Sequence, residues 1–188
     1  MPGQIKIDDG SGNYTVLTNG GSLGSDKTIT IPNTTGTMAL TSDISGGKVL
    51  QYVSATASTE QSTTSTSLVD NTGMTVNITP SSASNKVLVL YTDNGSINRT
   101  NDVSSGNITF SLLRDTTQLT ETDAGYYDGS GNTSRTWYGP LALNYVDSPN
   151  TTSQVTYKIQ FKASSNSTAK TKIFANTATI IAMELDVW

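Results

Sequence analysis

The sequence predicts an all-β protein, and two observations carry this prediction. The first is alternation: between residues 155 and 162, apolar and polar side chains follow one another in turn, which is the period of a strand with one buried face. The second is composition: about 32 residues are Thr and about 24 are Ser, far above average usage. Because Thr is β-branched and suits a half-exposed pleated surface, this excess favours strands over helices.

Residues 1–45 differ from the rest of the chain. Short strand-like pieces at 5–7, 14–17, 27–32 and 36–40 alternate with turn residues. These pieces carry about a dozen sizeable apolar side chains, which is too few for an independent core. We therefore expect an arm that is ordered by its own copies in an oligomer or by a larger surface, in preference to the alternative of a flexible tail, followed by a linker at 42–47.

Residues 46–188 predict a head domain with a core of its own, since a chain of about 140 residues buries roughly two-thirds of its unfolded surface. Short antiparallel strands joined by Gly, Asn, Asp and Ser turns point to a sandwich or a barrel. We expect strands at about 49–54, 66–70, 73–79, 86–92, 107–114, 117–121, 136–146, 154–163, 171–175 and 178–187.

The last predicted strand has apolar side chains on both faces. Such a strand is either central in a sheet or lies at a subunit interface, and closed homo-oligomers are common. We expect the interface, with Glu184 pairing with a cation of the neighbouring subunit. The candidate interface residues are Ile180, Ala182, Glu184 and Trp188.

Composition also excludes several kinds of function. The net charge is −4 and Lys and Arg are scattered, so we expect no nucleic-acid partner. The chain contains no His and no Cys, which removes Ser–His–Asp catalysis, thiolate chemistry and the commonest zinc ligands. Its apolar runs are too short to span a bilayer, and its first residues lack the pattern of a signal peptide. We expect no cofactor, no metal and no membrane insertion.

The segment 121–140 is the strongest candidate for a binding loop. Aromatic rings can stack on the apolar faces of sugars, while Asp, Asn and Arg can bond the hydroxyls, and such residues are favoured in adaptable binding loops on rigid scaffolds. Trp137 and Tyr138 are expected instead to begin the next strand, in the core or at an interface. The candidate glycan-binding residues are Tyr126, Tyr127, Asp128, Asn132 and Arg135.

Two further polar regions are interpreted as structural. Residues 93–106 form a polar stretch whose oxygen-bearing side chains fit no calcium-loop spacing, so we expect an ordinary solvated loop. Carboxylates cluster in sequence from Asp115 to Asp128, with Glu121 and Asp123 between them. Two carboxylates suffice for glycoside hydrolysis, but nothing in the pattern indicates the burial that raises the pKa of a catalytic acid. We expect a protein that is not an enzyme.

Residues 21–44, GSLGSDKTITIPNTTGTMALTSDI, resemble a segment that recurs in phage tail-fibre and related virion proteins, where it joins a shaft or anchoring region to the next part of the chain. The stretches 75–90, 111–115, 143–149 and 156–158 resemble the jelly-roll tip modules of phage and marine-virus structural proteins. The resemblance implies a trimer with a TNF- or C1q-like jelly roll in each subunit, carried on an N-terminal attachment region.

The expectation from the sequence is a phage virion structural protein located on the particle surface. In this interpretation it is a short fibre or a tail or baseplate tip subunit, whose trimeric head is exposed for adsorption to host-surface glycan. Residues 1–45 would attach to other virion proteins. The alternative is a capsid decoration or head-fibre protein that clamps capsomers through this arm, and the third hypothesis is a glycan-degrading enzyme.

Overall fold

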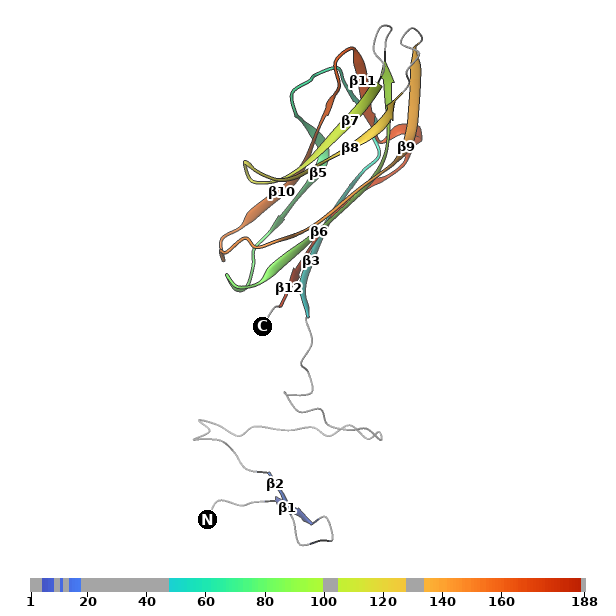
Figure 1. The fold of residues 1–188 in the computed structure, drawn as a ribbon. Coiled ribbons are helices and arrows are strands. Elements are labelled where there is room, and N and C mark those ends of the chain that lie inside the picture. The colour runs from blue at the N-terminus through green and yellow to red at the C-terminus, as the bar shows by residue number, and fades with distance from the viewer. Residues whose placement is uncertain are drawn as a thin grey trace. The chain divides into compact units, whose positions relative to one another are not determined.

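The computed structural model describes residues 5–8, 11, 14–17, 48–99, 105–127 and 134–186. The chain divides into two units, Met1–Ile44 and Ser45–Trp188. In the first unit, β1 (Ile5–Asp8) and β2 (Tyr14–Leu17) form an antiparallel pair with Ile5 opposite Leu17 (Figure 1). The strand-like pieces expected at 27–32 and 36–40 lie outside the described residues.

The second unit is built from antiparallel strands, and the described residues contain no α-helix. One turn of 3-10 helix, η2 (Ile173–Ala175), interrupts the strands near the C-terminus. The strands are β3 (Val49–Ala57), β4 (Gln61–Thr63), β5 (Val69–Ile78), β6 (Lys86–Arg99), β7 (Ser105–Arg114), β8 (Thr117–Tyr127), β9 (Arg135–Asp147), β10 (Val155–Ala163), β11 (Ser167–Thr171) and β12 (Ala178–Leu185).

These strands form two sheets. The first has the order β5-β10-β7-β8, and the second has β6 at its centre. β9 pairs with one edge of β6, while β12 and β11 share the other edge and are followed by β3 and β4. The long strands pair as nested couples, β3 with β12, β5 with β10, β6 with β9 and β7 with β8. A long antiparallel hairpin rolled across two sheets in this way is a jelly roll, as expected.

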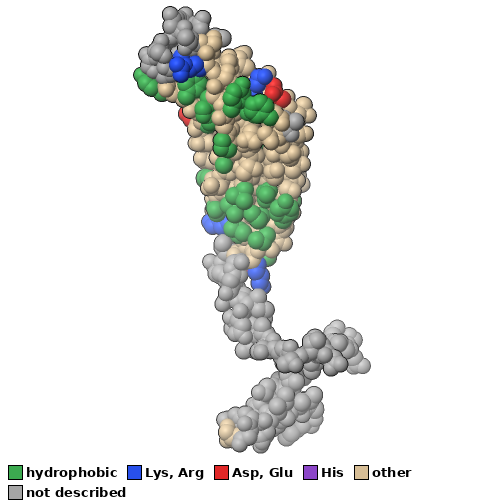
Figure 2. Space-filling model, turned by 90° about the vertical axis from the view of Figure 1, so that its right-hand side faces the viewer, with side chains coloured by type: hydrophobic (Ala, Val, Ile, Leu, Met, Phe, Trp, Pro, Cys, Tyr) green, Lys and Arg blue, Asp and Glu red, His purple; other side chains and the backbone are tan. Residues whose placement is uncertain are grey.

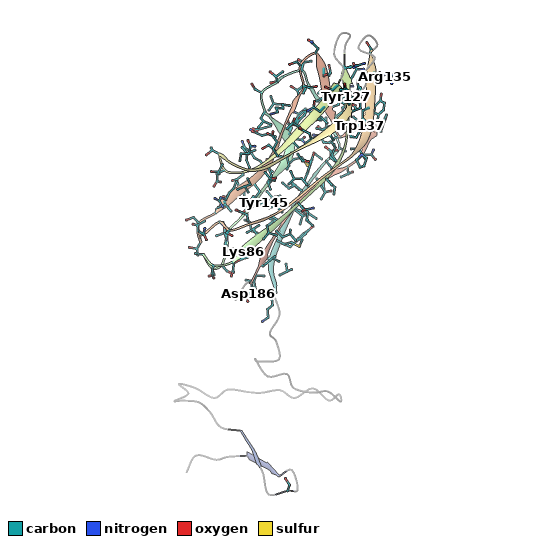
Figure 3. The ribbon with its side chains drawn as sticks, viewed as in Figure 1. Lys86, Tyr127, Arg135, Trp137, Tyr145 and Asp186 are labelled. Carbon is teal, nitrogen blue, oxygen red and sulfur yellow. The ribbon has the colours of Figure 1, made fainter. Side chains whose placement is uncertain are left out.

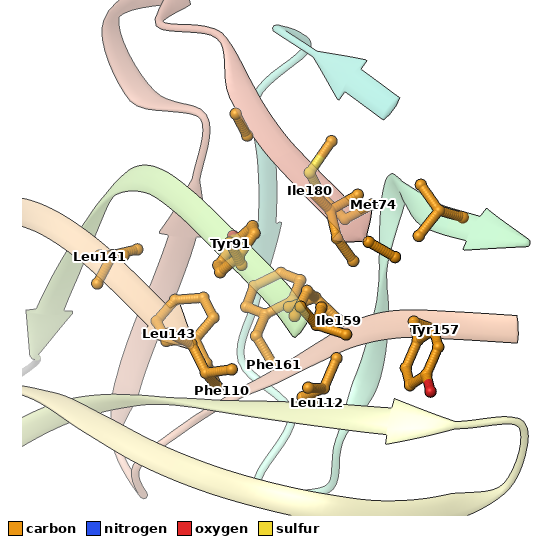
Figure 4. Packing of buried hydrophobic residues seen from close by; sticks show 14 of the residues in the cluster. Met74, Tyr91, Phe110, Leu112, Leu141, Leu143, Tyr157, Ile159, Phe161 and Ile180 are labelled. Carbon is orange, nitrogen blue, oxygen red and sulfur yellow. The ribbon is translucent and has the colours of Figure 1, made fainter. Parts of the chain in front are cut away.

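The core lies between the two sheets (Figure 4). The predicted alternation of β10 is confirmed, because Val155, Tyr157, Ile159 and Phe161 are buried. The ring of Phe110 stacks on that of Phe161 at 6.4 Å between centroids. Both of these rings belong to one sheet, and the ring of Tyr91 on β6, in the other sheet, lies 6.0 Å from that of Phe110.

Several strands differ in extent from the prediction. Residues 93–99, expected in a loop, continue β6, because β9 and β11 pair with both of its edges there. β8 runs on to Tyr127 because it pairs with β7 along one edge, with Tyr127 opposite Ser105. The strands expected at 66–70 and 73–79 are one strand, β5, in which Gly73 has φ +84°. The register of β10 shifts opposite this glycine, which is the geometry of a β-bulge.

The interface expected on β12 requires correction. Ile180, Ala182 and Glu184 are fully buried within one chain, so they have no surface to offer to a second subunit. Trp188 lies outside the described residues. The outward face of β12 carries Ile181, Met183 and Leu185 instead, which alternate with the buried side chains.

Glu184 is held by four hydrogen bonds from its own chain. Its carboxylate accepts from Gln51 Nε2 at 2.5 Å, from Asn85 Nδ2 at 2.6 Å, and from both the backbone N and the Oγ of Ser81 at 2.7 Å. Burial by itself would raise the pKa of Glu184, but these bonds outweigh it and lower the pKa to about 2. The charge therefore locks the loop that precedes β6 onto β3 and β12.

Because the folded pKa lies below the ordinary value of 4.5, Glu184 stabilises the fold above pH 4.5, and this stabilisation is lost as the pH falls towards 2. Glu184→Gln is expected to lower the free energy of unfolding at pH 7 by on the order of 3 kcal/mol. Between pH 4.5 and 2, the free energy of unfolding of the variant should also fall less steeply than that of the parent chain. Urea unfolding at a series of pH values measures this dependence. Glu60→Gln, an exposed control, should behave like the parent chain; a Glu184→Gln curve parallel to the parent would contradict the assignment.

Candidate functional site

Metal and membrane sites give no starting point. In the described part of the chain, no three residues among His, Cys, Asp and Glu come together in a way that could hold a metal ion. Across those same residues, no helix has the length and apolarity to span a bilayer. The candidate sites described below lie on the surface of the head.

The head has two distinct ends. At one end the chain enters and leaves side by side, because Asp186 N donates to Lys48 O at 2.9 Å. Figure 3 shows Tyr127, Arg135 and Trp137 together at the other end, away from Lys86 and Asp186. The length of the sandwich thus separates the connection to residues 1–44 from the aromatic residues singled out in the sequence.

Three of the predicted glycan-binding residues meet at this far end. Tyr126 OH donates to the carbonyl of Arg135 at 3.1 Å, and the Arg99 guanidinium lies 5.6 Å from the centre of the Tyr126 ring. Tyr126 also packs against the core, whereas Tyr127 is 80% exposed. Together with Trp137 they line a shallow hollow of about 240 Å³. Asp128 and Asn132 lie outside the described residues.

Trp137 and Tyr138 point to opposite faces of β9. Trp137 is half-buried and packs against the core, as expected. Its ring lies over Gly139, where a Cβ would sit 2.2 Å from Trp137 Cζ2, so only glycine fits there. Tyr138, expected in the core or at an interface, is 56% exposed on the outer face of the six-stranded sheet.

Tyr138 belongs to a larger groove that the sequence analysis did not predict. Its ring lies 5.3 Å from the ring of Phe174, with the planes at 41°. The two rings form one side of an open groove of about 380 Å³, which we call the aromatic groove. The remaining lining comes from β6, β9, β11, η2 and the segment before β4: Glu60, Ser96, Asn98, Thr136, Thr168, Lys170 and Ile173.

The backbone at Phe174 is strained. Phe174 has φ 58° and ψ 31°, the left-handed region that costs a bulky residue on the order of 1–3 kcal/mol. Burial of the ring does not account for this strain, because Phe174 is 73% exposed. A strained backbone that presents an aromatic side chain to solvent is a signal of function. The sequence pattern missed it because residues 171–175 were expected to be a strand.

The polar lining of the aromatic groove is paired internally. Lys170 Nζ lies 2.8 Å from Glu60 Oε1, and Asn98 Nδ2 donates to Thr136 Oγ1 at 2.6 Å. The charges in the lining therefore cancel, and the remaining groups are hydroxyls, amides and two rings. A mixture of aromatic faces and a few fixed polar groups suits an uncharged polyhydroxyl ligand.

The same sheet carries an apolar surface nearer its other end. Tyr52, Met183, Leu88 and Val146 lie in register across β3, β12, β6 and β9. Ile181 and Leu90 continue the surface in the next row. We call these six residues the outer apolar stripe. Tyr52 and Val146 are more than half exposed. Figure 2 shows hydrophobic side chains gathered in two places on this side of the head, one near each end.

The carboxylates considered for glycoside hydrolysis are engaged separately. Asp115 Oδ1 accepts from Thr156 N at 2.9 Å, and Asp123 Oδ1 accepts from Thr109 Oγ1 at 2.5 Å. Glu121 lies 3.6 Å from Lys162. All three carboxylates are exposed, and each contacts a different partner.

No family model matches the chain, and no curated protein sequence matches it. Solved structures give weak similarity. The viral particle of infectious bursal disease virus is 11% identical, with a TM-score of 0.34, over 72% of this chain and 37% of that chain. The VP2 protein of that virus in derived particles is 12% identical, with a TM-score of 0.34, over 91% of this chain and 42% of that chain.

The Eiger TNF of S. frugiperda is 10% identical, with a TM-score of 0.29, over 73% of this chain and 94% of that chain. This chain spans less than half the length of the two viral chains. At such scores the similarity carries no conclusion about what the chain does, and the jelly-roll assignment rests on the strand order.

Proposed function

We propose that this chain is a non-enzymatic structural protein of a phage virion, which acts as a trimeric short fibre or as a tail or baseplate tip. Residues 1–45 attach it to other virion proteins, and the far end of each head adsorbs to glycan on the host surface. One observation supports this most: Phe174, whose backbone is strained, and Tyr138 are both exposed on the outer face of the head, whereas residues 48 and 186 meet at the other end. The resemblance of residues 21–44 to virion attachment segments supports the location.

The outer apolar stripe is proposed as the surface through which three heads associate. A contiguous apolar surface on a soluble chain marks an interaction site. The stripe crosses β3, β12, β6 and β9, and its members on β3 and β12 belong to the two strands beside which the chain enters the head. Association there brings three arms together and leaves the far ends accessible. Weak binding at each far end then gains avidity, because the second and third contacts are intramolecular.

The aromatic groove is proposed as the main glycan site. The rings of Tyr138 and Phe174 offer a surface for the apolar face of a sugar ring, and Lys170, Glu60 and Asn98 border it with donors and acceptors. Since the charges cancel, the groove favours neutral sugars. Tyr127 and Arg135 provide a second, shallower contact at the same end.

Phe174→Gly should separate binding from folding. Glycine adopts φ 58° without strain, so the free energy of unfolding is expected to stay level or to rise by up to about 1 kcal/mol. Loss of the ring should weaken binding to neutral glycans by about tenfold or more, as one desolvated aromatic contact is worth over 1.4 kcal/mol. Binding of the purified full chain to an array of neutral and acidic glycans, with urea unfolding in parallel, measures both.

Tyr127→Ala is the matched comparison, because it removes another exposed ring at the same end. Binding lost in Tyr127→Ala alone would move the site to residues 126–135. Binding retained in both variants would contradict adsorption through the head. It would favour the alternative, a capsid decoration protein whose affinity resides in residues 1–45.

Met183→Glu should dissociate the trimer. The side chain lies between Tyr52 and Leu88 in the outer apolar stripe, so three carboxylates would be desolvated together at the interface. Light scattering is expected to give three times 19.8 kDa for the parent chain and a monomer for the variant. Thr75→Glu, on the outer face of the other sheet, should remain trimeric. A monomeric parent chain would overturn the assignment.

A further inference from the structure

A group of polar side chains lies buried between the two sheets, apart from the surfaces described above. Its centre is Lys172, which directly follows β11, and Asn71 on β5. Lys172 and Asn71 are each 1% exposed, and Tyr91 and Asp93 on β6 complete the group. A fully buried lysine is unusual and needs a physical account.

The surroundings of Lys172 favour a neutral amine. Its Nζ contacts Asn71 Oδ1 closely and lies 3.1 Å from Thr171 Oγ1. In the described part of the chain no carboxylate forms a salt bridge with it. Burial lowers the pKa of Lys172 below its ordinary value, against the opposing effect of Asp93. A desolvated lysine without a contacting counter-ion is a nucleophile.

The amide of Asn71 is placed as the electrophile. Since Cγ is bonded to Oδ1 at about 1.2 Å, the contact with Nζ brings the amine close to the separation of about 3–3.5 Å at which atoms react. The other end of the amide also has a partner, because Asn71 Nδ2 donates to Tyr91 OH at 2.9 Å. The group that would leave is thus in contact with a hydroxyl.

Asp93 supports that hydroxyl. Tyr91 OH donates to Asp93 Oδ2 at 2.8 Å, and Asp93 Oδ1 accepts from the backbone N of Lys172 at 3.0 Å. Burial raises the pKa of Asp93, although hydrogen bonds from Tyr91, Asn94 and Lys172 oppose the rise. A carboxyl of raised pKa can hold a proton and pass it through Tyr91 to the leaving nitrogen.

We propose that Lys172 and Asn71 join in an intramolecular isopeptide bond. Lys172 Nζ attacks Asn71 Cγ, the Nζ–Cγ bond forms and the Cγ–Nδ2 bond breaks. The amine loses one proton, and the departing NH₂ group gains one through Tyr91 and Asp93, so that one molecule of ammonia leaves. The step involves no oxidant, reductant or cofactor.

The bond would tie β5 of one sheet to the end of β11 in the other, between positions 101 residues apart in sequence. Closing so long a loop restricts the unfolded chain and opposes separation of the sheets. Lys172 has φ 54°, a left-handed conformation in which the side chain nevertheless reaches the interior. This strain is consistent with a residue held for a reaction.

The intact mass of the purified full chain tests the proposal directly. The expected mass is lower than that of the unmodified sequence by one ammonia, about 17 Da. Fragmentation after proteolysis should give one branched peptide that contains positions 71 and 172. A chain with the full sequence mass and no branched peptide would overturn the proposal.

Lys172→Met is expected to keep the full mass and to unfold at a lower urea concentration than the parent chain. Lys170 lies two residues earlier in the chain and is on the surface, so Lys170→Met should lose ammonia as the parent chain does. An Asn–Gly pair such as Asn94–Gly95 also loses ammonia when it forms a succinimide, so a loss that persists in Lys172→Met would refute the bond. In Asn71→Asp the same amide would form with loss of water, about 18 Da.

Asp93 acts on the leaving nitrogen only through Tyr91, so it is a positioning residue. Two substitutions of Asp93 test this role. Asp93→Asn keeps a hydrogen-bond acceptor but cannot exchange a proton, so the cross-linked fraction should fall. Asp93→Glu keeps the carboxyl and should restore part of it. Complete cross-linking in Asp93→Asn would show that its proton takes no part. Tyr91→Phe removes the hydroxyl beside the leaving nitrogen and is expected to lower the cross-linked fraction as well.

Discussion

The pairing of β6 along both of its edges is the constraint on which the rest of the head depends. β9 covers one edge from Val87 to Arg99, while β12 and β11 divide the other edge between them. With both edges bonded, the backbone stays extended through polar residues that would otherwise form a loop. Side chains on the outer face of β6 contribute to both the outer apolar stripe and the aromatic groove. Those on its inner face supply Tyr91 and Asp93.

The jelly-roll connectivity also explains the polarity of the head. The first and last long strands, β3 and β12, are paired, so the chain enters and leaves at one end. The end of β8 and the start of β9 lie at the other end, where Tyr127 and Arg135 are found. In the proposed function, attachment and recognition lie at opposite ends of this sandwich. Recognition residues are commonly found in such positions on β scaffolds.

The interior of the head contains more polar chemistry than its apolar pattern suggests. Glu184 and Lys172 are both buried, yet their hydrogen-bond partners differ. Four hydrogen bonds satisfy the Glu184 carboxylate and hold it charged, as a buried anion requires. Lys172 has two neutral oxygen partners and no salt bridge within the described residues. This difference in surroundings underlies the proposal that Lys172 reacts, whereas Glu184 has a structural role.

The sequence by itself determined the fold class and the faces of the regular strands. In β10 one face is apolar and the other polar, so the period of two also identifies which face is buried. On β12 both faces are apolar, and alternation alone could not tell that Ile180 and Ala182 point inward. The absence of His and Cys likewise restricts the chemistry that the side chains can perform, whatever their arrangement in space.

Tertiary structure decided the extent of the strands and the composition of the sites. β6 continues past Asp93 because strands distant in sequence bond to it, which no local pattern records. The aromatic groove joins residues that are far apart in sequence, namely 60, 96, 98, 136, 138, 168, 170, 173 and 174. Its most unusual member, Phe174, is identified by its backbone angle rather than by its residue type. Lys172 meets Asn71 because the two sheets close on each other. Local alternation specifies faces, whereas the pairing of distant strands specifies neighbours.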